Sequence, residues 1–187
     1  MDALDSVEQE LNDATERARR LVDSTEPRFF TVRPHPSSWS AAECMAHLSL
    51  ASESFLPILR NAVDDGRKRG LTGEGFPSME LLPRLLKWFL EPPVRKRIKT
   101  QAPFVPRAAR ARADAMAEFA SLQSQLIELL RSARGLALGK LKVVSPFDSR
   151  LRYNVYSAFR IVAAHERRHL WQAEQAVEEL RRRLVAA

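Results

Sequence analysis

Cysteine, glycine and aromatic residues are scarce in this 187-residue chain, and each scarcity argues against particular classes of protein fold. The single cysteine, Cys44, cannot form an internal disulfide, which excludes a disulfide-stapled scaffold. Six glycines and 7% aromatic residues suit helices better than a turn-rich β-sandwich, and 45% of the residues are hydrophobic. The length fits one hydrophobic core, so we expect a single domain spanning residues 1–187.

Long apolar runs are also missing. No stretch approaches the roughly 18 consecutive apolar residues of a membrane-spanning helix. The most apolar segment, 81–90, is interrupted by Pro83, Arg84 and Lys87. The N-terminal segment has no apolar core of the kind that directs secretion. We therefore expect a cytoplasmic protein with no membrane partner.

Positive charge exceeds negative charge, with a formal net charge of +7. The excess is concentrated at 95–99, 107–112 and 181–183. Basic patches are typical of nucleic-acid-binding proteins, but these are not interleaved with aromatic residues that would stack on bases. We interpret the charge as a solvated surface that could attract an anionic substrate. Nucleic-acid binding is kept as a less favoured alternative.

The first half of the chain predicts two helices. Over 2–24, apolar residues recur at spacings of three and four, the period of one helical face. A second helix over 40–69 is opened by Ser40 and Glu43, which match a capping box. Glycine and proline then break the pattern over 70–106, which we interpret as a long crossover.

The second half predicts two more long helices. One covers about 108–134, and the last begins at a cap, Asp148 or Ser149, and continues to about residue 184. A short helix over 79–90 lies within the crossover. Four long helices predict an all-α, four-helix bundle with the crossover between its second and third helices.

The last helix carries two histidines, His165 and His169, spaced so that both lie on one face. That spacing lets two imidazoles reach one metal ion at about 2.0–2.1 Å each. The same face continues through small or apolar positions and one glutamine: Ala158, Val162, Gln172 and Ala176. Two core histidines bonded to backbone carbonyls would give the same pattern, so the pair alone leaves both interpretations open.

His165-Glu166-Arg167-Arg168-His169 also matches H-E-x-x-H, in which the glutamate is the general base of a zinc protease. That interpretation makes Glu166 the base and needs a further ligand downstream. No histidine follows, although three acidic residues do: Glu174, Glu178 and Glu179. Little strand character precedes the helix to form a substrate-binding edge. A protease is therefore a poor hypothesis.

A third helical histidine, His47, lies one turn beyond Glu43, and Trp39 precedes the capping box. Together with H-x-x-x-H-x-x-Q on the last helix, this arrangement resembles the DinB/YfiT-like superfamily of four-helix metal-binding proteins. The similarity covers nearly the whole chain, including 89–95 in the crossover. It implies that His47, His165 and His169 ligate one divalent metal ion, nickel or zinc foremost, with open positions for water or substrate.

The resemblance also suggests chemistry, because the superfamily includes transferases and isomerases that act with low-molecular-weight thiols. We expect a small-molecule substrate and a metal-dependent transferase or hydrolase, with such a thiol as the leading co-substrate. The alternative is a non-catalytic bundle in which the metal clips two helices together. Pairing into a homodimer rests on analogy alone. No catalytic residue is assigned, and the three histidines are expected as metal ligands only.

Other polar residues have ordinary structural explanations. Cys44 is interpreted as a small core residue. Glu43 is a helix cap that could also orient His47, and Gln172 could face a metal-bound water or satisfy a backbone group. His35, between prolines, is expected in an exposed loop. The chain contains no G-x-S-x-G, G-x-x-x-x-G-K or C-x-x-C motif, so serine hydrolysis, nucleotide hydrolysis and disulfide exchange have no support.

Overall fold

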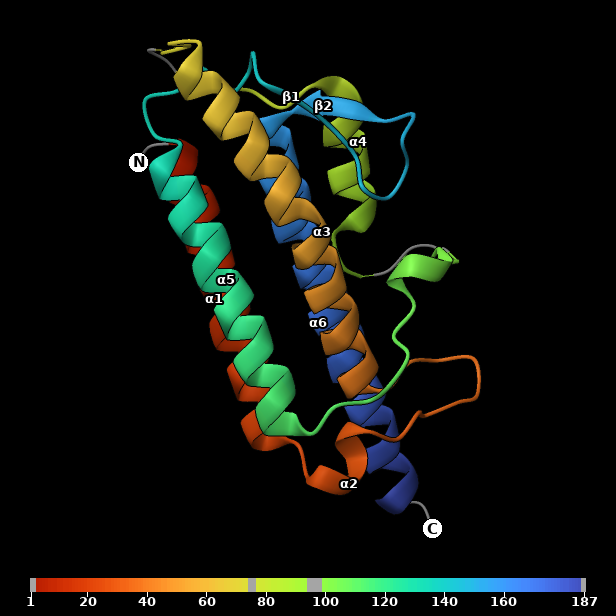
Figure 1. The fold of residues 1–187 in the computed structure, drawn as a ribbon. Helices are drawn as coiled ribbons and strands as arrows, with labels where there is room; N and C mark the ends of the chain where they lie inside the picture. Colours follow the sequence, from red (N-terminus) through yellow and green to blue (C-terminus); the bar gives the residue numbers. More distant parts are fainter. Residues whose placement is uncertain (1–2, 74–76, 94–98, 186–187) are drawn as a thin grey trace.

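A computed structural model describes residues 3–73, 77–93 and 99–185, and this part of the chain is predominantly helical. Four long helices lie side by side (Figure 1): α1 (Ala3–Ser24), α3 (Ala41–Lys68), α5 (Arg112–Ser132) and α6 (Val155–Val185). The short elements are α2 (Pro27–Phe30), α4 (Leu81–Leu90), the 3-10 helix η1 (Ala102–Phe104), β1 (Lys142–Val144) and β2 (Arg152–Asn154). The predicted all-α class holds, apart from one small two-stranded sheet.

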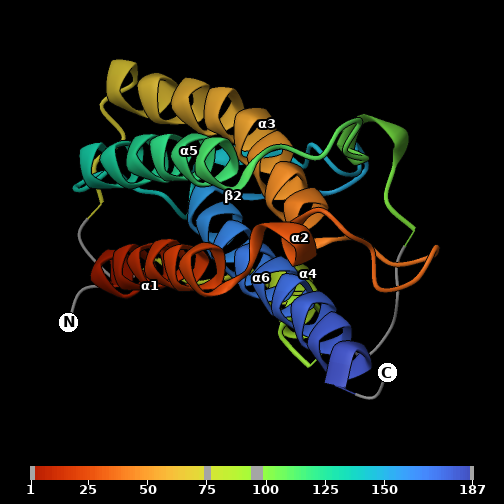
Figure 2. The ribbon, with the colours of Figure 1, turned by 90° about the horizontal axis from the view of Figure 1, so that it is seen from below.

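The long helices run in two directions, with α1 and α6 pointing one way and α3 and α5 the other (Figure 1). Both α3 and α1 pack against α5 and α6 (Figure 2). Because α3 and α5 are parallel, the chain between them has to return along the molecule. Helix α4 belongs to this return and packs on α6.

The core consists of two apolar clusters at opposite ends of the long helices. One cluster gathers large side chains that include Leu11, Phe55, Leu59, Leu130 and Phe159. The other contains many small residues and includes Ala18, Met45, Leu48, Phe119 and Leu170. Each large buried side chain contributes about 1.5–3 kcal/mol. On α6 the apolar core stops at Ala164 and resumes at Leu170, so His165 and His169 lie between the two clusters.

The last helix begins later than predicted, at Val155 instead of 148–149. Its N-terminus is capped by Asn154, whose Oδ1 accepts a hydrogen bond of 2.7 Å from the backbone N–H of Ser157. The residues before it form the unpredicted antiparallel pair of β1 and β2, with Val143 opposite Tyr153. These strands have three residues each, which is too short for an alternating pattern to be recognised.

Two further boundaries differ from the sequence-based prediction. Helix α5 begins at Arg112, and the guanidinium of Arg112 donates a hydrogen bond of 3.1 Å to the carbonyl of Val22 near the end of α1. The predicted loop after α1 contains α2, which starts at Pro27 because proline is well suited to a first helical turn. The side chains of Phe29 and Phe30 are buried, and α2 packs against α3 and α6.

Within residues 3–73, 77–93 and 99–185, no helix has the length and apolar character needed to cross a bilayer.

Candidate metal centre

His47 is positioned by the start of α3. The side-chain oxygen of Ser40 accepts a 3.2 Å hydrogen bond from the backbone N–H of Glu43, whose carboxylate accepts one of 2.9 Å from the N–H of Ser40. The predicted capping box is therefore present. Arg33 holds the same carboxylate with bonds of 3.0 and 2.8 Å. Glu43 is thus engaged at the helix start, and His47 follows about one turn further on.

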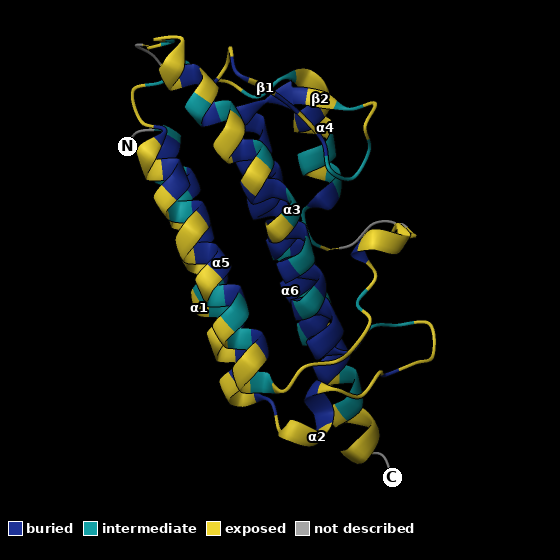
Figure 3. Cartoon of the chain, in the orientation of Figure 1, coloured by how far each residue is buried: buried dark blue, intermediate teal, exposed yellow. Residues whose placement is uncertain are grey.

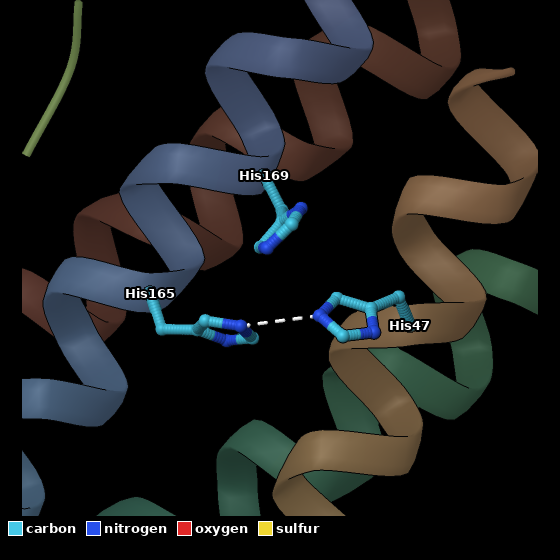
Figure 4. Close-up of side chains that lie close together, drawn as sticks. All are labelled: His47, His165 and His169. Atoms are coloured by element: carbon cyan, nitrogen blue, oxygen red, sulfur yellow. Dashed lines mark hydrogen bonds between the residues drawn. The ribbon is translucent and has the colours of Figure 1, made fainter. Parts of the chain in front are cut away.

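The structure brings the three predicted histidines together (Figure 4), with His47 on α3 facing His165 and His169 on α6. One nitrogen from each ring can be chosen so that all three lie within 4.8 Å of one another. The Nε2 atoms of His47 and His165 are 3.1 Å apart. All three side chains are buried, with exposed fractions of 3%, 7% and 8% in chain order.

The second ring nitrogen of His47 has its own partner. Nδ1 lies 2.8 Å from the backbone carbonyl oxygen of Phe104. A carbonyl only accepts hydrogen bonds, so Nδ1 carries the proton and donates, which leaves a lone pair on Nε2. This is the arrangement by which an outer hydrogen bond fixes the tautomer and ring orientation of a metal-ligating histidine.

Burial sets the protonation state of the cluster. It lowers the pKa of His47, which the hydrogen bond to Phe104 opposes. It lowers the pKa of His165 and His169 well below the ordinary value, and repulsion from His47 and Arg168 lowers both further. All three rings are therefore neutral at neutral pH, and neutral imidazole is the form that binds metal ions.

The donor set fits a divalent transition metal ion. The Nδ1 atom of His169 is buried and has no hydrogen-bond partner among the described residues. An unpartnered buried polar atom costs about 1–3 kcal/mol, and coordination of a shared metal ion is one way in which such a cost is removed. Imidazole nitrogens suit zinc, nickel, copper and iron alike, and therefore do not choose the metal. Gln172 interacts with the His169 ring and raises its pKa, which places this glutamine beside the cluster.

Aromatic side chains surround the histidines. The ring of Trp39 is 4.9 Å from that of His47 and 6.0 Å from that of His169. The ring of Phe147 is 5.1 Å from His165 and 4.7 Å from Phe104. Gln101 donates a hydrogen bond to the carbonyl of Phe147, which ties the η1 segment to the β1–β2 loop. Sequence reasoning does not identify Phe104 or Phe147 as part of the site.

Glu166 does not take part in this cluster. Its Oε2 accepts a 3.0 Å hydrogen bond from Gln123 on α5, and the same amide nitrogen donates to the carbonyl of Leu11 on α1. Burial raises the pKa of this carboxyl to about 8. Glu174, a suggested downstream ligand, instead forms a two-bond ion pair with Arg17 at 2.7 and 2.6 Å. The H-E-x-x-H interpretation is therefore not supported.

The remaining candidate residues have the ordinary structural roles that the sequence suggests for them. Cys44 is fully buried in the small-residue core cluster, and burial raises the pKa of its thiol. The carboxylate of Glu43 accepts hydrogen bonds from Ser40 and Arg33, as described above. Among the described residues, no hydrogen bond joins Glu43 to His47. His35 is exposed and lies within hydrogen-bond distance of the guanidinium of Arg183.

Comparison with known proteins gives one family. The profile of the DinB superfamily matches residues 10–173, which includes all three histidines. No curated protein and no solved structure gives a significant match. Because the matched region covers most of the chain, the protein belongs to the DinB superfamily.

Proposed function

We propose that this four-helix-bundle domain binds one divalent ion, nickel or zinc, through His47, His165 and His169. In this proposal it is a metal-dependent transferase or hydrolase for a small-molecule substrate, with a low-molecular-weight thiol as leading co-substrate. The observation that carries it is the convergence of three buried, neutral imidazoles with ligand atoms within 4.8 Å. Three protein ligands leave a coordination position open, as in catalytic and not structural zinc sites.

The residues around the cluster have definable tasks. A bound divalent ion polarises substrate oxygens and lowers the pKa of a coordinated water or thiol. Phe104 holds His47 in one tautomer through its carbonyl oxygen. Trp39 and Phe147 cover the rings with apolar surface, which limits the access of bulk water. A dry surrounding strengthens electrostatic interactions inside the site.

Elemental analysis tests the site. Untagged protein purified without chelator should carry about one equivalent of metal, and His47→Ala, His165→Ala and His169→Ala should each lose it. His35→Ala is the matched control, because His35 is an exposed histidine outside the cluster. Metal retained in all three cluster variants, or a native protein that takes up none on reconstitution, would return these histidines to the role of core residues.

A non-catalytic, metal-stabilised bundle is the second candidate. The burial of all three rings favours it, because the ligands join α3 to α6 with little exposed surface. The two proposals differ in whether a coordination position is open to small molecules. In Co²⁺-substituted protein, added thiol should change the visible absorption spectrum if a position is open. An unchanged spectrum would favour the structural metal.

The structure adds little support for nucleic-acid binding. Several basic residues of the predicted clusters form ion pairs with acidic side chains: Arg110 pairs with Glu118, and Arg182 and Arg183 pair with Glu179. The residues at 95–98 lie outside the described part of the chain. Binding to DNA that weakens steeply with added salt would reopen this alternative.

A further inference from the structure

The histidine cluster is closed to solvent. The side chains of His47, His165 and His169 are exposed by only 3%, 7% and 8%. A small molecule can therefore reach them only when part of their cover moves, as loops do over many active sites. The need for such a movement rests on the proposed function, because a purely structural metal requires no entry path.

Two of the covering aromatic residues belong to segments that are held firmly. Trp39 immediately precedes Ser40, the cap of α3. Phe147 lies in the loop between β1 and β2, where the backbone N–H of Ser145 donates a 2.9 Å hydrogen bond to the carbonyl of Leu151. The strands on either side of this loop pair with each other, so both covering segments are tied to regular structure.

The third covering segment is the η1 segment, residues 99–105. It lies beside α3, outside the four long helices (Figure 1). Phe104 is its only buried side chain, and Figure 3 shows most of η1 as exposed. Its own backbone hydrogen bonds are local, from Phe104 to Gln101 at 3.0 Å and from Val105 to Ala102 at 3.2 Å. A segment with few buried apolar contacts opens at a low cost in free energy.

Gln101 and Phe104 make the polar contacts between the η1 segment and the rest of the described chain. The side-chain amide of Gln101 donates a hydrogen bond to the carbonyl of Phe147. The carbonyl of Phe104 accepts one of 2.8 Å from Nδ1 of His47, and the ring of Phe104 is 4.7 Å from that of Phe147. Movement of the segment away from α3 would therefore uncover this side of the cluster and remove the outer partner of His47.

We propose that the η1 segment is a gate, which opens to admit small molecules to the histidine cluster and in opening releases the hydrogen bond that orients His47. Gln101 holds the gate closed through the carbonyl of Phe147. The outer partners of metal-ligating histidines are worth about 10–100-fold in metal affinity. The open state therefore binds the metal more weakly, so entry of a small molecule and loss of the metal pass through the same opening.

Stopped-flow spectroscopy of Co²⁺-loaded protein tests the gate. The visible absorption follows two reactions, removal of the metal by excess EDTA and binding of 2-mercaptoethanol. Gln101→Ala should accelerate both reactions by the same factor, roughly two- to tenfold, because it removes one hydrogen bond that holds the closed state. Gln125→Ala is the matched control, since Gln125 is an exposed glutamine whose amide donates to the carbonyl of Ser121 within α5. It should react like the native protein.

The comparison of the two reactions separates gating from a loss of stability. A variant that merely unfolded more often would lose metal faster without binding thiol faster, and that result would overturn the gate. Equal rates of metal removal from native protein and Gln101→Ala, each carrying Co²⁺, would also overturn it while leaving the metal site in place. Bound Co²⁺ that does not respond to thiol would assign a structural ion and no gate. Protein that takes up no Co²⁺ would overturn the proposed function, and the gate with it.

Discussion

Glu166 is adjacent to His165 in sequence but lies on another side of α6, where its carboxyl contacts Gln123. We therefore expect Glu166→Gln to keep the bound metal and any metal-dependent turnover, because the amide has nearly the same shape and can accept the same hydrogen bond. A general base contributes at least about 100-fold to a rate. The measurements are the metal content and the turnover, either of the best small-molecule substrate found by screening in the presence of low-molecular-weight thiols or of a generic peptide.

A fall of that size in Glu166→Gln, with metal content unchanged, would restore the protease hypothesis. His169→Ala serves as the reference, since it should lose metal and turnover together. Thermal unfolding resolves intermediate losses, because it reports whether the substitution has disturbed the packing of α6 on α1 or the hydrogen bond from Gln123 of α5.

The three histidines could be singled out through the resemblance to the DinB/YfiT-like superfamily, because the motifs that carry it are local. His165 and His169 are one turn apart, and the Ser40–Glu43 capping box fixes the start of the helix that carries His47. The partner of His47 could not be predicted. Phe104 is 57 residues away in sequence and reaches the histidine through the path of the crossover, which no local pattern records.

At the scale of the element, the contribution of the α3 capping box to the stability of the fold should be measurable. Ser40→Ala removes the acceptor for the Glu43 N–H, and an N-cap of this kind is worth about 0.5–2 kcal/mol. For a chain of this size, 1 kcal/mol corresponds to roughly 2–4 °C in Tm. Thermal unfolding in chelator should therefore show a decrease of a few degrees. Ser37→Ala, at an exposed position of the preceding loop, should leave Tm unchanged. Equal Tm values for the two variants would show that the cap does not contribute measurably to stability.

Element length decides how well the sequence predicted the fold. The four long helices repeat their apolar spacing over many turns, so their existence was predicted and only their ends moved. Helix α2 and strands β1 and β2 have three or four residues each, and a period cannot be read over so few positions. Their formation depends on tertiary packing, such as the burial of Phe30 and Tyr153.

Across the whole molecule, Glu91 joins the end of α4 to α6. Its carboxylate bonds to Lys87 and to Arg167, which also pairs with Glu10 of α1. Burial raises the pKa of Glu91, but the bonds from Arg167 and Lys87 outweigh it and lower the pKa from 4.5 to about 2. A depressed pKa stabilises the fold above the unfolded value of 4.5, and this contribution is lost as the pH falls toward 2.

Glu91→Gln should therefore be less stable than the native chain near neutral pH, by about 1–2 kcal/mol once solvent screening is allowed for. The difference should shrink as the pH falls from 4.5 toward 2. Urea unfolding at several pH values, in chelator so that metal loss does not contribute, measures it. A difference that does not change with pH would show that Glu91 acts through packing and not through its charge.

A metal ion bound as proposed should also contribute to the stability of the whole fold, because the three proposed ligands come from α3 and α6, which belong to different parts of the chain. A ligand that binds only the folded state at 100 times its Kd adds about 2.7 kcal/mol. At roughly 2–4 °C per kcal/mol, chelation should lower Tm by about 5–10 °C.

Differential scanning calorimetry of native protein and His169→Ala, each with and without chelator, separates the effect of the metal on Tm from the effect of the side chain. The variant should unfold near the temperature of the chelated native protein and respond little to chelator, because it holds no metal to lose. A native protein that loaded one equivalent of metal yet melted at the same temperature after chelation would mean that coordination does not join α3 to α6.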